Sequence, residues 1–321
     1  MRTATLSDAP LHRTDQLPPP WPGRRVPLNG GLVYVRRTPG GPDSEAALYV
    51  HGLGGASTNW TDYAGLLSNR LDGQALDLFG FGRSGPAPRG DYRIETHVQT
   101  VIAAIEALGG PVHLIGNSLG GLTSILVTGR RPDLVTTLTL ISPAVPDLRP
   151  PRQMSTPLFP LLLLPGIARA VERRMAGISP EERVQAMLEL CFADLERVPE
   201  QRLTEAIDEA RVRADFPWAA TALARSFRSL VAAYLTPGVR NPWRIAAGIK
   251  QPTLIIWGDR DKLVNVRNAP RLAALIPDAR LLVLPGIGHT PQLEDPLSSA
   301  RATLAMLDEV RTATFAGPEP A

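Results

Sequence analysis

Seven short apolar runs alternate with longer segments of helical periodicity over two separated parts of the chain. Several runs are apolar at successive positions, which is typical of strands buried on both faces. The expected strands are Leu32–Arg36, Ala46–Val50, Gln74–Leu78, Val112–Ile115, Thr137–Ile141, Thr253–Trp257 and Arg280–Leu284. The expected helices between them include His97–Leu108, Leu119–Thr128 and Ala269–Leu275. This alternation predicts an α/β fold with a mostly parallel sheet and helices on both faces.

The alternation stops between about Asp147 and Arg244, where only helical patterns occur. Ser179-Pro180-Glu181-Glu182 supplies an N-cap, a proline at the first helical position and a glutamate at the third. The expected helices are Glu182–Arg197, Glu200–Ala214 and Ala219–Leu235. A block of this length is too long for a loop, so we expect residues 147–244 to form a helical cap over one end of the sheet.

The ends of the chain differ in composition from the parts between them. Residues 1–23 are polar and proline-rich, which predicts a flexible arm. The apolar patterns assign residues 24–146 and 245–315 to the sheet-containing core. Residues 316–321 have the composition of a disordered tail.

Composition and charge limit the kinds of molecule that the protein is expected to bind. The 321 residues are 44% hydrophobic and 20% charged, as is ordinary for a soluble globular protein. The net charge is +3 and the arginines are scattered among 31 acids, which argues against nucleic-acid binding. Cys191 is the single cysteine, so neither an intramolecular disulfide nor a cysteine metal cluster is expected. Its apolar helical surroundings favour a small buried hydrophobe.

The hydropathy pattern predicts no transmembrane segment. The N-terminus lacks the apolar core of a signal peptide. The longest apolar stretch, Leu158–Ala168, is broken by Pro160 and Pro165 and is too short to cross a bilayer. A cytoplasmic location is therefore expected.

A serine between glycines follows the apolar run Val112–Ile115. The segment Gly116-Asn117-Ser118-Leu119-Gly120-Gly121 matches G-x-S-x-G between a predicted strand and a predicted helix, the context that this pattern requires. Gly116 and Gly120 provide the clearance that a tight, strained turn needs. We therefore expect Ser118 to be a nucleophile. The alternative is an ordinary strand-to-helix turn with an incidental serine.

A serine nucleophile needs a neighbouring base, and the chain offers five histidines. His12 lies in the arm, His97 in a helical pattern and His113 inside a strand, while His51 opens a glycine-rich loop. His289 follows the last predicted strand, and active sites of such sheets gather at the carboxyl ends of strands. His289 is therefore the expected general base.

Two loops supply candidates for the remaining roles. Gly258-Asp259-Arg260-Asp261 ends the strand Thr253–Trp257, and its spacing does not decide which aspartate orients the imidazole. His51-Gly52-Leu53-Gly54-Gly55 ends the strand Ala46–Val50. Such a loop can direct a backbone N–H at a developing oxyanion, with the N–H of Leu119 as the second donor.

One glycine motif matches the pattern of a nucleotide-binding site, but the residues that follow it argue against that function. Gly80-Phe81-Gly82-Arg83-Ser84-Gly85 matches the dinucleotide fingerprint formally. Pro86 and Pro88 follow it where a helix should open, and no strand ending in an acid appears about 20 residues later. We therefore expect no nucleotide cofactor.

These motifs, in their order and rough spacing, resemble the α/β-hydrolase superfamily. The matching segments are His51–Gly54, Asp77–Ser84, Gly116–Gly121, Gly258–Asp261 and Gly288–His289, within about residues 30–145 and 245–310. They look like the subgroup of small-molecule esterases, meta-cleavage-product hydrolases, lipases and cofactor-free haloperoxidases. The resemblance implies the α/β-hydrolase fold with an inserted cap. It also implies that Asp261 is the acid, and that the backbone N–H groups of Leu53 and Leu119 form the oxyanion hole.

The resemblance further implies hydrolysis of a carboxylic ester, or a related acyl compound, of a small to medium apolar substrate, without metal or cofactor. Carbon–carbon hydrolases commonly carry a tryptophan after the histidine, whereas this chain has Thr290, which favours an ester. The alternatives are carbon–carbon (meta-cleavage-product) hydrolysis, and a ligand-binding receptor or non-catalytic relic. The apolar stretch Leu158–Pro165 could line a substrate entrance, pack against the core or form a homodimer contact.

Overall fold

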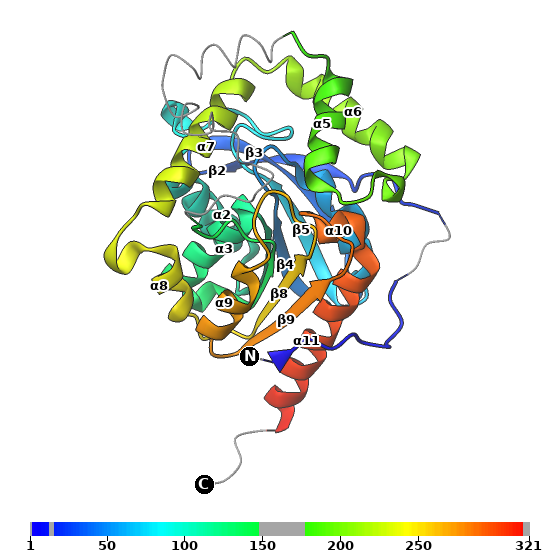
Figure 1. Cartoon of the computed structure of the whole chain (residues 1–321), viewed down its shortest axis with the longest axis vertical. Helices are drawn as coiled ribbons and strands as arrows, with labels where there is room; N and C mark the ends of the chain where they lie inside the picture. Colours follow the sequence, from blue (N-terminus) through cyan, green and yellow to red (C-terminus); the bar gives the residue numbers. More distant parts are fainter. Residues whose placement is uncertain (1, 13–15, 148–176, 317–321) are drawn as a thin grey trace.

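A nine-stranded, mostly parallel sheet forms the centre of the computed structural model, which describes residues 2–12, 16–147 and 177–316 (Figure 1). The strand order is β1-β9-β8-β7-β6-β4-β5-β3-β2. Strands β2 and β3 run antiparallel to their neighbours, and the other pairs are parallel. The strands are β1 (Arg2–Thr3), β2 (Gly23–Leu28), β3 (Gly31–Thr38), β4 (Glu45–Val50), β5 (Leu71–Asp77), β6 (Val112–Asn117), β7 (Val135–Ile141), β8 (Thr253–Gly258) and β9 (Ala279–Leu284). The predicted α/β class is confirmed.

Helices cover both faces of the sheet and bury two apolar clusters. One face carries α2 (Ile94–Leu108), α3 (Leu119–Arg130), α8 (Pro242–Ala247) and α9 (Asn268–Leu275). The other face carries α1 (Thr61–Leu66), α10 (Pro291–Glu294) and α11 (Pro296–Ala316). Every residue of β6 and β8 is buried, which explains their unbroken apolar runs.

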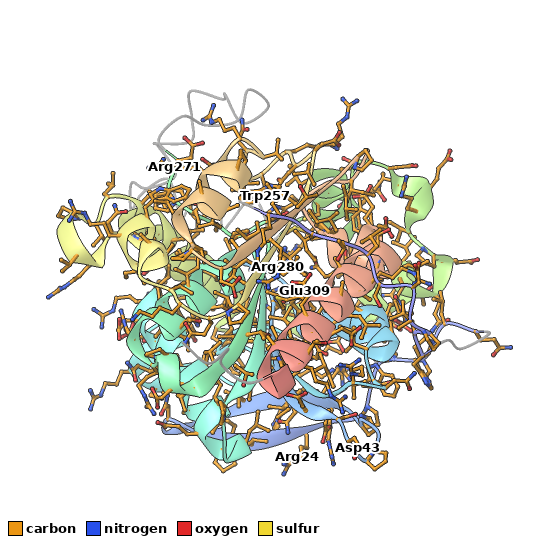
Figure 2. All side chains as sticks on the ribbon, turned by 90° about the horizontal axis from the view of Figure 1, so that it is seen from below. Arg24, Asp43, Trp257, Arg271, Arg280 and Glu309 are labelled. Carbon is orange, nitrogen blue, oxygen red and sulfur yellow. The ribbon has the colours of Figure 1, made fainter. Side chains whose placement is uncertain are left out.

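The helix α11 is fixed to the sheet by polar contacts as well as by packing. Arg280 of β9 donates to Glu309 at 2.7 Å, and both residues are labelled in Figure 2. The hydroxyls of Tyr63 and Thr303 lie 2.5 Å apart, which joins α1 to α11. These bonds hold the segment that follows His289 against the core.

The N-terminal segment packs on the core, although its composition predicts a flexible arm. β1 pairs with β9, and the Ser7 N–H donates to the carbonyl of Arg301. Leu11 is buried in the cluster between the sheet and α11. The segment therefore follows the core surface, because its few apolar residues find partners there.

Between β7 and β8, the described residues form α5 (Pro180–Cys191), α6 (Glu200–Ala214) and α7 (Ala219–Tyr234), which we call the inserted helices, and then α8 of the core. In Figure 1, α5 and α6 lie at the top of the molecule and α7 descends along the left side. The capping box predicted at Ser179 is present, with its hydroxyl accepting from Glu182. The apolar stretch Leu158–Ala168 lies outside the described residues.

The first inserted helix is shorter than the sequence predicts. A helix was expected over Glu182–Arg197, but α5 ends at Cys191 and a separate short turn, η6, covers Leu195–Arg197. The backbone leaves the helix because the N–H groups of Ala193 and Asp194 donate to the carboxylate of Glu294 instead of to helical carbonyls.

Buried ion pairs attach α6 to the core. Arg202 donates to both oxygens of Asp62 on α1, at 2.8 and 2.5 Å, and the two side chains are only 11% and 15% exposed. Glu209 accepts from Arg36 of β3 and from Arg83, both at 2.9 Å. The inserted helices are thus held by charges as well as by apolar contacts.

We expect Arg202→Ala to destabilise the fold by about 3 kcal/mol, because it leaves Asp62 buried without its partner. Urea unfolding followed by circular dichroism measures the change. Arg211→Ala is the matched control, since Arg211 on the same helix pairs with Glu181 in an exposed position and should change the stability little. Equal losses of stability in the two variants would contradict the role of the buried Arg202–Asp62 pair.

Candidate active site

The Ser118 turn has the strained geometry that its glycines predict. Ser118 lies between β6 and α3 with φ 54° and ψ −115°, a backbone conformation that residues with side chains rarely adopt. A Cβ on Gly116 would lie 2.5 Å from the carbonyl oxygen of Gly120, and one on Gly120 would collide with the carbonyl oxygen of Val50. Only glycine at both positions lets α3 approach β4 and β6 this closely.

Asp261 and His289 form a hydrogen-bonded pair at the carboxyl ends of β8 and β9. The Nδ1 atom of His289 lies 2.8 Å from Oδ2 of Asp261, and both side chains are almost fully buried. Because the carboxylate accepts, Nδ1 carries the proton and Nε2 keeps a free lone pair. The imidazole is thus in the tautomer that a general base needs.

Four donors hold the carboxylate of Asp261. Oδ1 accepts from the N–H groups of Leu263 and Val264, and Oδ2 accepts from His289 and from the indole of Trp257. Every partner is a donor, as an ionised carboxylate requires. Asp259 lies elsewhere in the loop and accepts from Gly286 N–H at 2.7 Å. The geometry therefore separates the two aspartates that spacing could not.

Ser118 and His289 reach the same region from different strands. The amide of Asn117, beside Ser118, donates to the carbonyls of Ile141 and His289 at 3.1 and 3.3 Å. Within the described part of the chain, no hydrogen bond joins the Ser118 hydroxyl to the imidazole. Catalytic hydrogen bonds are often long without substrate and shorten in the reacting complex.

The loop after β4 lies against the serine turn and is held by hydrogen bonds to the Gly52 carbonyl. The Gly52 carbonyl accepts from Gly55 N–H at 3.1 Å and lies 2.7 Å from Nδ1 of His51. The peptide is planar and trans, so the Leu53 N–H points away from both donors. Gly52 also touches the serine turn, since a Cβ there would lie 3.1 Å from Cβ of Ser118.

The N–H groups of Leu53 and Leu119 donate to no acceptor within the described residues. Leu119 is the first residue of α3, and the first N–H groups of a helix have no partner inside it. Leu119 directly follows Ser118, and Leu53 follows Gly52, which lies against the serine turn. This pair is the arrangement that can bind an oxyanion.

His51 keeps this loop in place, a role that the sequence did not reveal. Its Nε2 accepts from the N–H of Leu78 at 3.1 Å, so Nδ1 must carry the proton that is donated to Gly52. Burial lowers the pKa of His51 to about 4, which keeps the ring neutral, as both bonds require. The signal for this role is a histidine immediately before the glycines.

Two further histidines have structural partners. His113 is buried in β6 and lies between Thr137 and Glu45 at 2.8 and 3.0 Å. His97 of α2 donates to Ser226 of α7 at 2.9 Å and joins the core to the inserted helices. Burial lowers the pKa of both rings, that of His97 to about 3.

The inserted helices contact the loop after β4, which lies beside Ser118. Arg213 of α6 donates to the Gly54 carbonyl at 2.6 Å, and its guanidinium carbon lies 5.3 Å from the ring centre of Phe81. Burial lowers the pKa of Arg213 to about 10. Met187 and Leu223 lie near Gly54, so apolar side chains as well as the Arg213 guanidinium lie beside this loop. Cys191, expected to be buried, is half-buried at the end of α5, and burial raises the pKa of its thiol to about 12.

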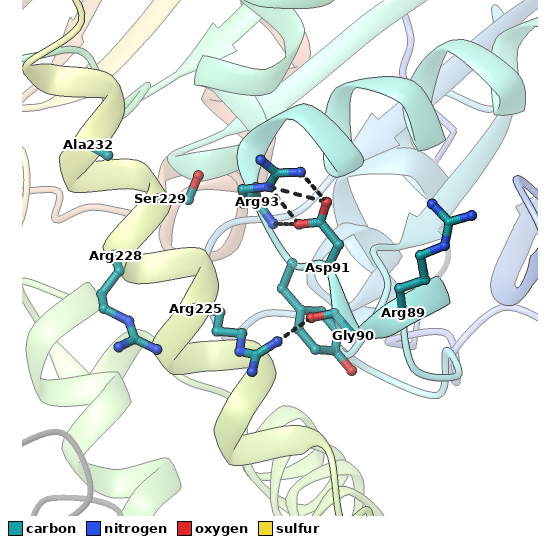
Figure 3. A pocket seen from close by; sticks show the side chains of 9 residues that line it. Arg89, Gly90, Asp91, Arg93, Arg225, Arg228, Ser229 and Ala232 are labelled. Carbon is teal, nitrogen blue, oxygen red and sulfur yellow. Dashed lines mark hydrogen bonds and ion pairs between the residues drawn. The ribbon is translucent and has the colours of Figure 1, made fainter. Parts of the chain in front are cut away.

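The other features considered among the described residues do not form a second candidate active site. No group of three histidine, cysteine, aspartate or glutamate side chains could hold a metal ion there. The glycine motif at Gly80–Gly85 is followed by Pro86, Ala87 and a three-residue 3-10 turn, Pro88–Gly90, instead of an α-helix opening directly after it. A Cβ on Gly82 would collide with the Asp77 carboxylate. Four arginines are among the residues that line a surface groove beside α7 (Figure 3): Arg89, Arg93, Arg225 and Arg228. None of the predicted site residues lines it.

Among residues 2–12, 16–147 and 177–316, the structure contains no helix with the length and apolarity that crossing a membrane requires.

Comparison with known proteins gives consistent matches. The sequence model of the alpha/beta hydrolase fold family matches residues 48–296. Lipase 1 of Psychrobacter immobilis is 25% identical over 273 residues, which are 82% of this chain and 76% of that protein. The crystal structure of a bacterial membrane phospholipase A is similar with a TM-score of 0.70 at 26% identity, covering 90% of this chain and 86% of that one. A meta-cleavage product hydrolase from Pseudomonas fluorescens IP01 shares the fold, with a TM-score of 0.71 at 21% identity over 89% and 98% of the two chains.

The buried neutral histidines generate a prediction about acid stability. We expect the free energy of unfolding to decrease as the pH falls from about 6.5 toward 4. In this window the unfolded chain binds protons at His51, His97 and His113, whereas the folded chain binds them only at lower pH. Urea unfolding at several pH values measures the slope. His97→Phe should make the slope shallower, and an unchanged slope would contradict the assignment.

Proposed function

Since the chain belongs to the α/β-hydrolase family and is a hydrolase, we propose that it is a serine carboxylesterase acting through Ser118, His289 and Asp261. The observation that carries the proposal is the His289–Asp261 pair beside a strained serine turn with two free backbone donors. Lipases among the relatives support an ester as substrate.

The mechanism is a two-step acyl transfer. The Ser118 oxygen attacks the carbonyl carbon while its proton moves to Nε2 of His289. The N–H groups of Leu53 and Leu119 bind the oxyanion. The imidazolium then protonates the leaving alcohol, and the acyl-enzyme remains. Water attacks next and gives its proton to Nε2. The acid then leaves, and the proton returns to Ser118.

We assign the segment 147–244 to a cap that covers the site. Its helices α5–α7 contact the loops after β4, β8 and β9, at Gly54, Lys262 and His289. Met187 and Leu223 add apolar surface beside the oxyanion loop, which supports an apolar acyl group.

We expect Ser118→Ala to lower kcat/KM for p-nitrophenyl esters by about 10⁴-fold or more, because no other group replaces the nucleophile. Initial rates across chain lengths measure it, with Ser142→Ala as the control at the end of the neighbouring strand. Labelling of the unmodified protein by a fluorophosphonate should place the adduct on Ser118. Absence of labelling would favour a receptor or relic, and faster cleavage of a dienol diketone than of any ester would favour carbon–carbon hydrolysis.

We expect His51→Phe to lower kcat for esters by about 100-fold with little change in KM. The phenyl ring fills the space but cannot donate to Gly52, so the peptide that carries the Leu53 N–H loses one of its two restraints. His113→Phe is the control, since that ring lies far along the strand from the site. Equal kcat values in the two variants would refute the role of His51.

A further inference from the structure

The loops that carry the proposed acid and base both contact one turn of the inserted helices, residues 191–194. The N–H of His289 donates to the carbonyl of Cys191 at 2.6 Å. Lys262, next to Asp261, donates to the carbonyls of Glu189 and Phe192 at 2.8 and 2.9 Å. The end of α5 is thus bonded to both loops.

Glu294 lies behind this turn and is 4% exposed. One carboxylate oxygen accepts from the N–H of Gly288 at 2.7 Å. The same carboxylate accepts from the N–H groups of Ala193 and Asp194 at 3.1 and 3.0 Å. It therefore bridges the residue before His289 to the turn that follows α5.

The bridge allows little movement because the two backbones touch. A Cβ on Gly288 would collide with the carbonyl oxygen of Cys191 and would lie 2.7 Å from the nitrogen of Ala193. Glycine at this position lets the turn rest directly on the histidine loop. A shift of the turn would therefore move the His289 backbone as well.

A carboxylate suits this position better than a neutral group would. A buried anion is tolerated only when donors surround it, and here three backbone N–H groups do so. Bonds from N–H groups to an anion are shorter and about twice as strong as neutral ones. Among the described residues, Glu294 makes no ion pair, so its charge serves these backbone groups.

We propose that Glu294 is a positioning residue that fixes the orientation of His289 by locking its loop to the inserted helices. The proposal rests on the proposed function of His289 as base. Glu294 does not touch the reacting atoms. It acts through the Gly288–His289 peptide and through the turn at 191–194, so the base is aligned only while that turn is in place.

The test is Glu294→Gln. The amide presents an N–H₂ group where one oxygen accepted, so either Gly288 or the turn loses its acceptor. We expect the resulting shift of the His289 loop to lower kcat for a p-nitrophenyl ester about 100-fold and to change KM by less than about threefold. The downfield proton NMR signal of the His289–Asp261 bond should shift or broaden. Asp295→Asn is the matched control: it removes the neighbouring carboxylate that caps α11 through Ser298, and asparagine can still cap. It should leave kcat and the signal unchanged.

A Glu294→Gln protein that is less stable yet keeps both kcat and the proton signal would overturn the proposal, because its role would then be structural only. If this variant does not fold, Lys262→Met loosens the same turn from the acid loop without touching Glu294. A reduced kcat with an altered proton signal in Lys262→Met supports the proposal. A kcat and a proton signal equal to those of the unmodified protein would overturn it.

Fluorophosphonate labelling separates failure of this proposal from failure of the proposed function. If the unmodified protein is not labelled at Ser118, the proposed function is wrong. If the unmodified protein and Glu294→Gln are labelled at the same rate, the function stands and the role of Glu294 is wrong. The proton signal gives an answer that does not depend on turnover.

Discussion

The close approach of helix α3 to the ends of β4 and β6 is the constraint on which the site depends. Without side chains at Gly116 and Gly120, the first turn of α3 lies against the Val50 carbonyl. This contact holds Ser118 at a positive φ and brings the first turn of α3 against the carbonyls of Val50 and His51. A methyl group at either glycine would push α3 away from β4 and β6. Ser118 and the N–H of Leu119 would then lie farther from the loop after β4.

The sequence predicted the central sheet well and its edges poorly, for a physical reason. Strands such as β6 and β8 are buried on both faces, so their apolar runs are unbroken. The edge strand β2 is mostly exposed and contains Pro27, so neither periodicity nor β-propensity marks it. The end of α5 was missed because Glu294, about 100 residues later, takes its N–H groups. Local pattern carries no information about such a partner.

The candidate site residues likewise depend partly on local sequence features and partly on contacts between distant residues. The glycine spacing around Ser118 and the place of His289 after a strand are local features, and the structure brings the two loops that they mark into the same region. The choice between Asp259 and Asp261 depended on resemblance, because both follow the same strand. The structure distinguishes them by long-range geometry: Asp261 faces the imidazole, while Asp259 holds Gly286. The role of His51 also depends on a distant partner, the N–H of Leu78.

The inserted helices bond to two loops of the candidate site, and under the proposed function this links substrate coverage to the alignment of the base. Arg213 donates to the Gly54 carbonyl in the loop after β4, and the Cys191 carbonyl at the end of α5 accepts from the N–H of His289. Under the proposed function, the helices that add apolar surface beside Gly54 also carry the bonds that hold the loop of the proposed base. A change in the inserted helices would then keep the proposed catalytic groups aligned only if these two attachments remain. Substrate preference should accordingly be adjustable through side chains such as Met187 and Leu223, which touch the loop without bonding to it.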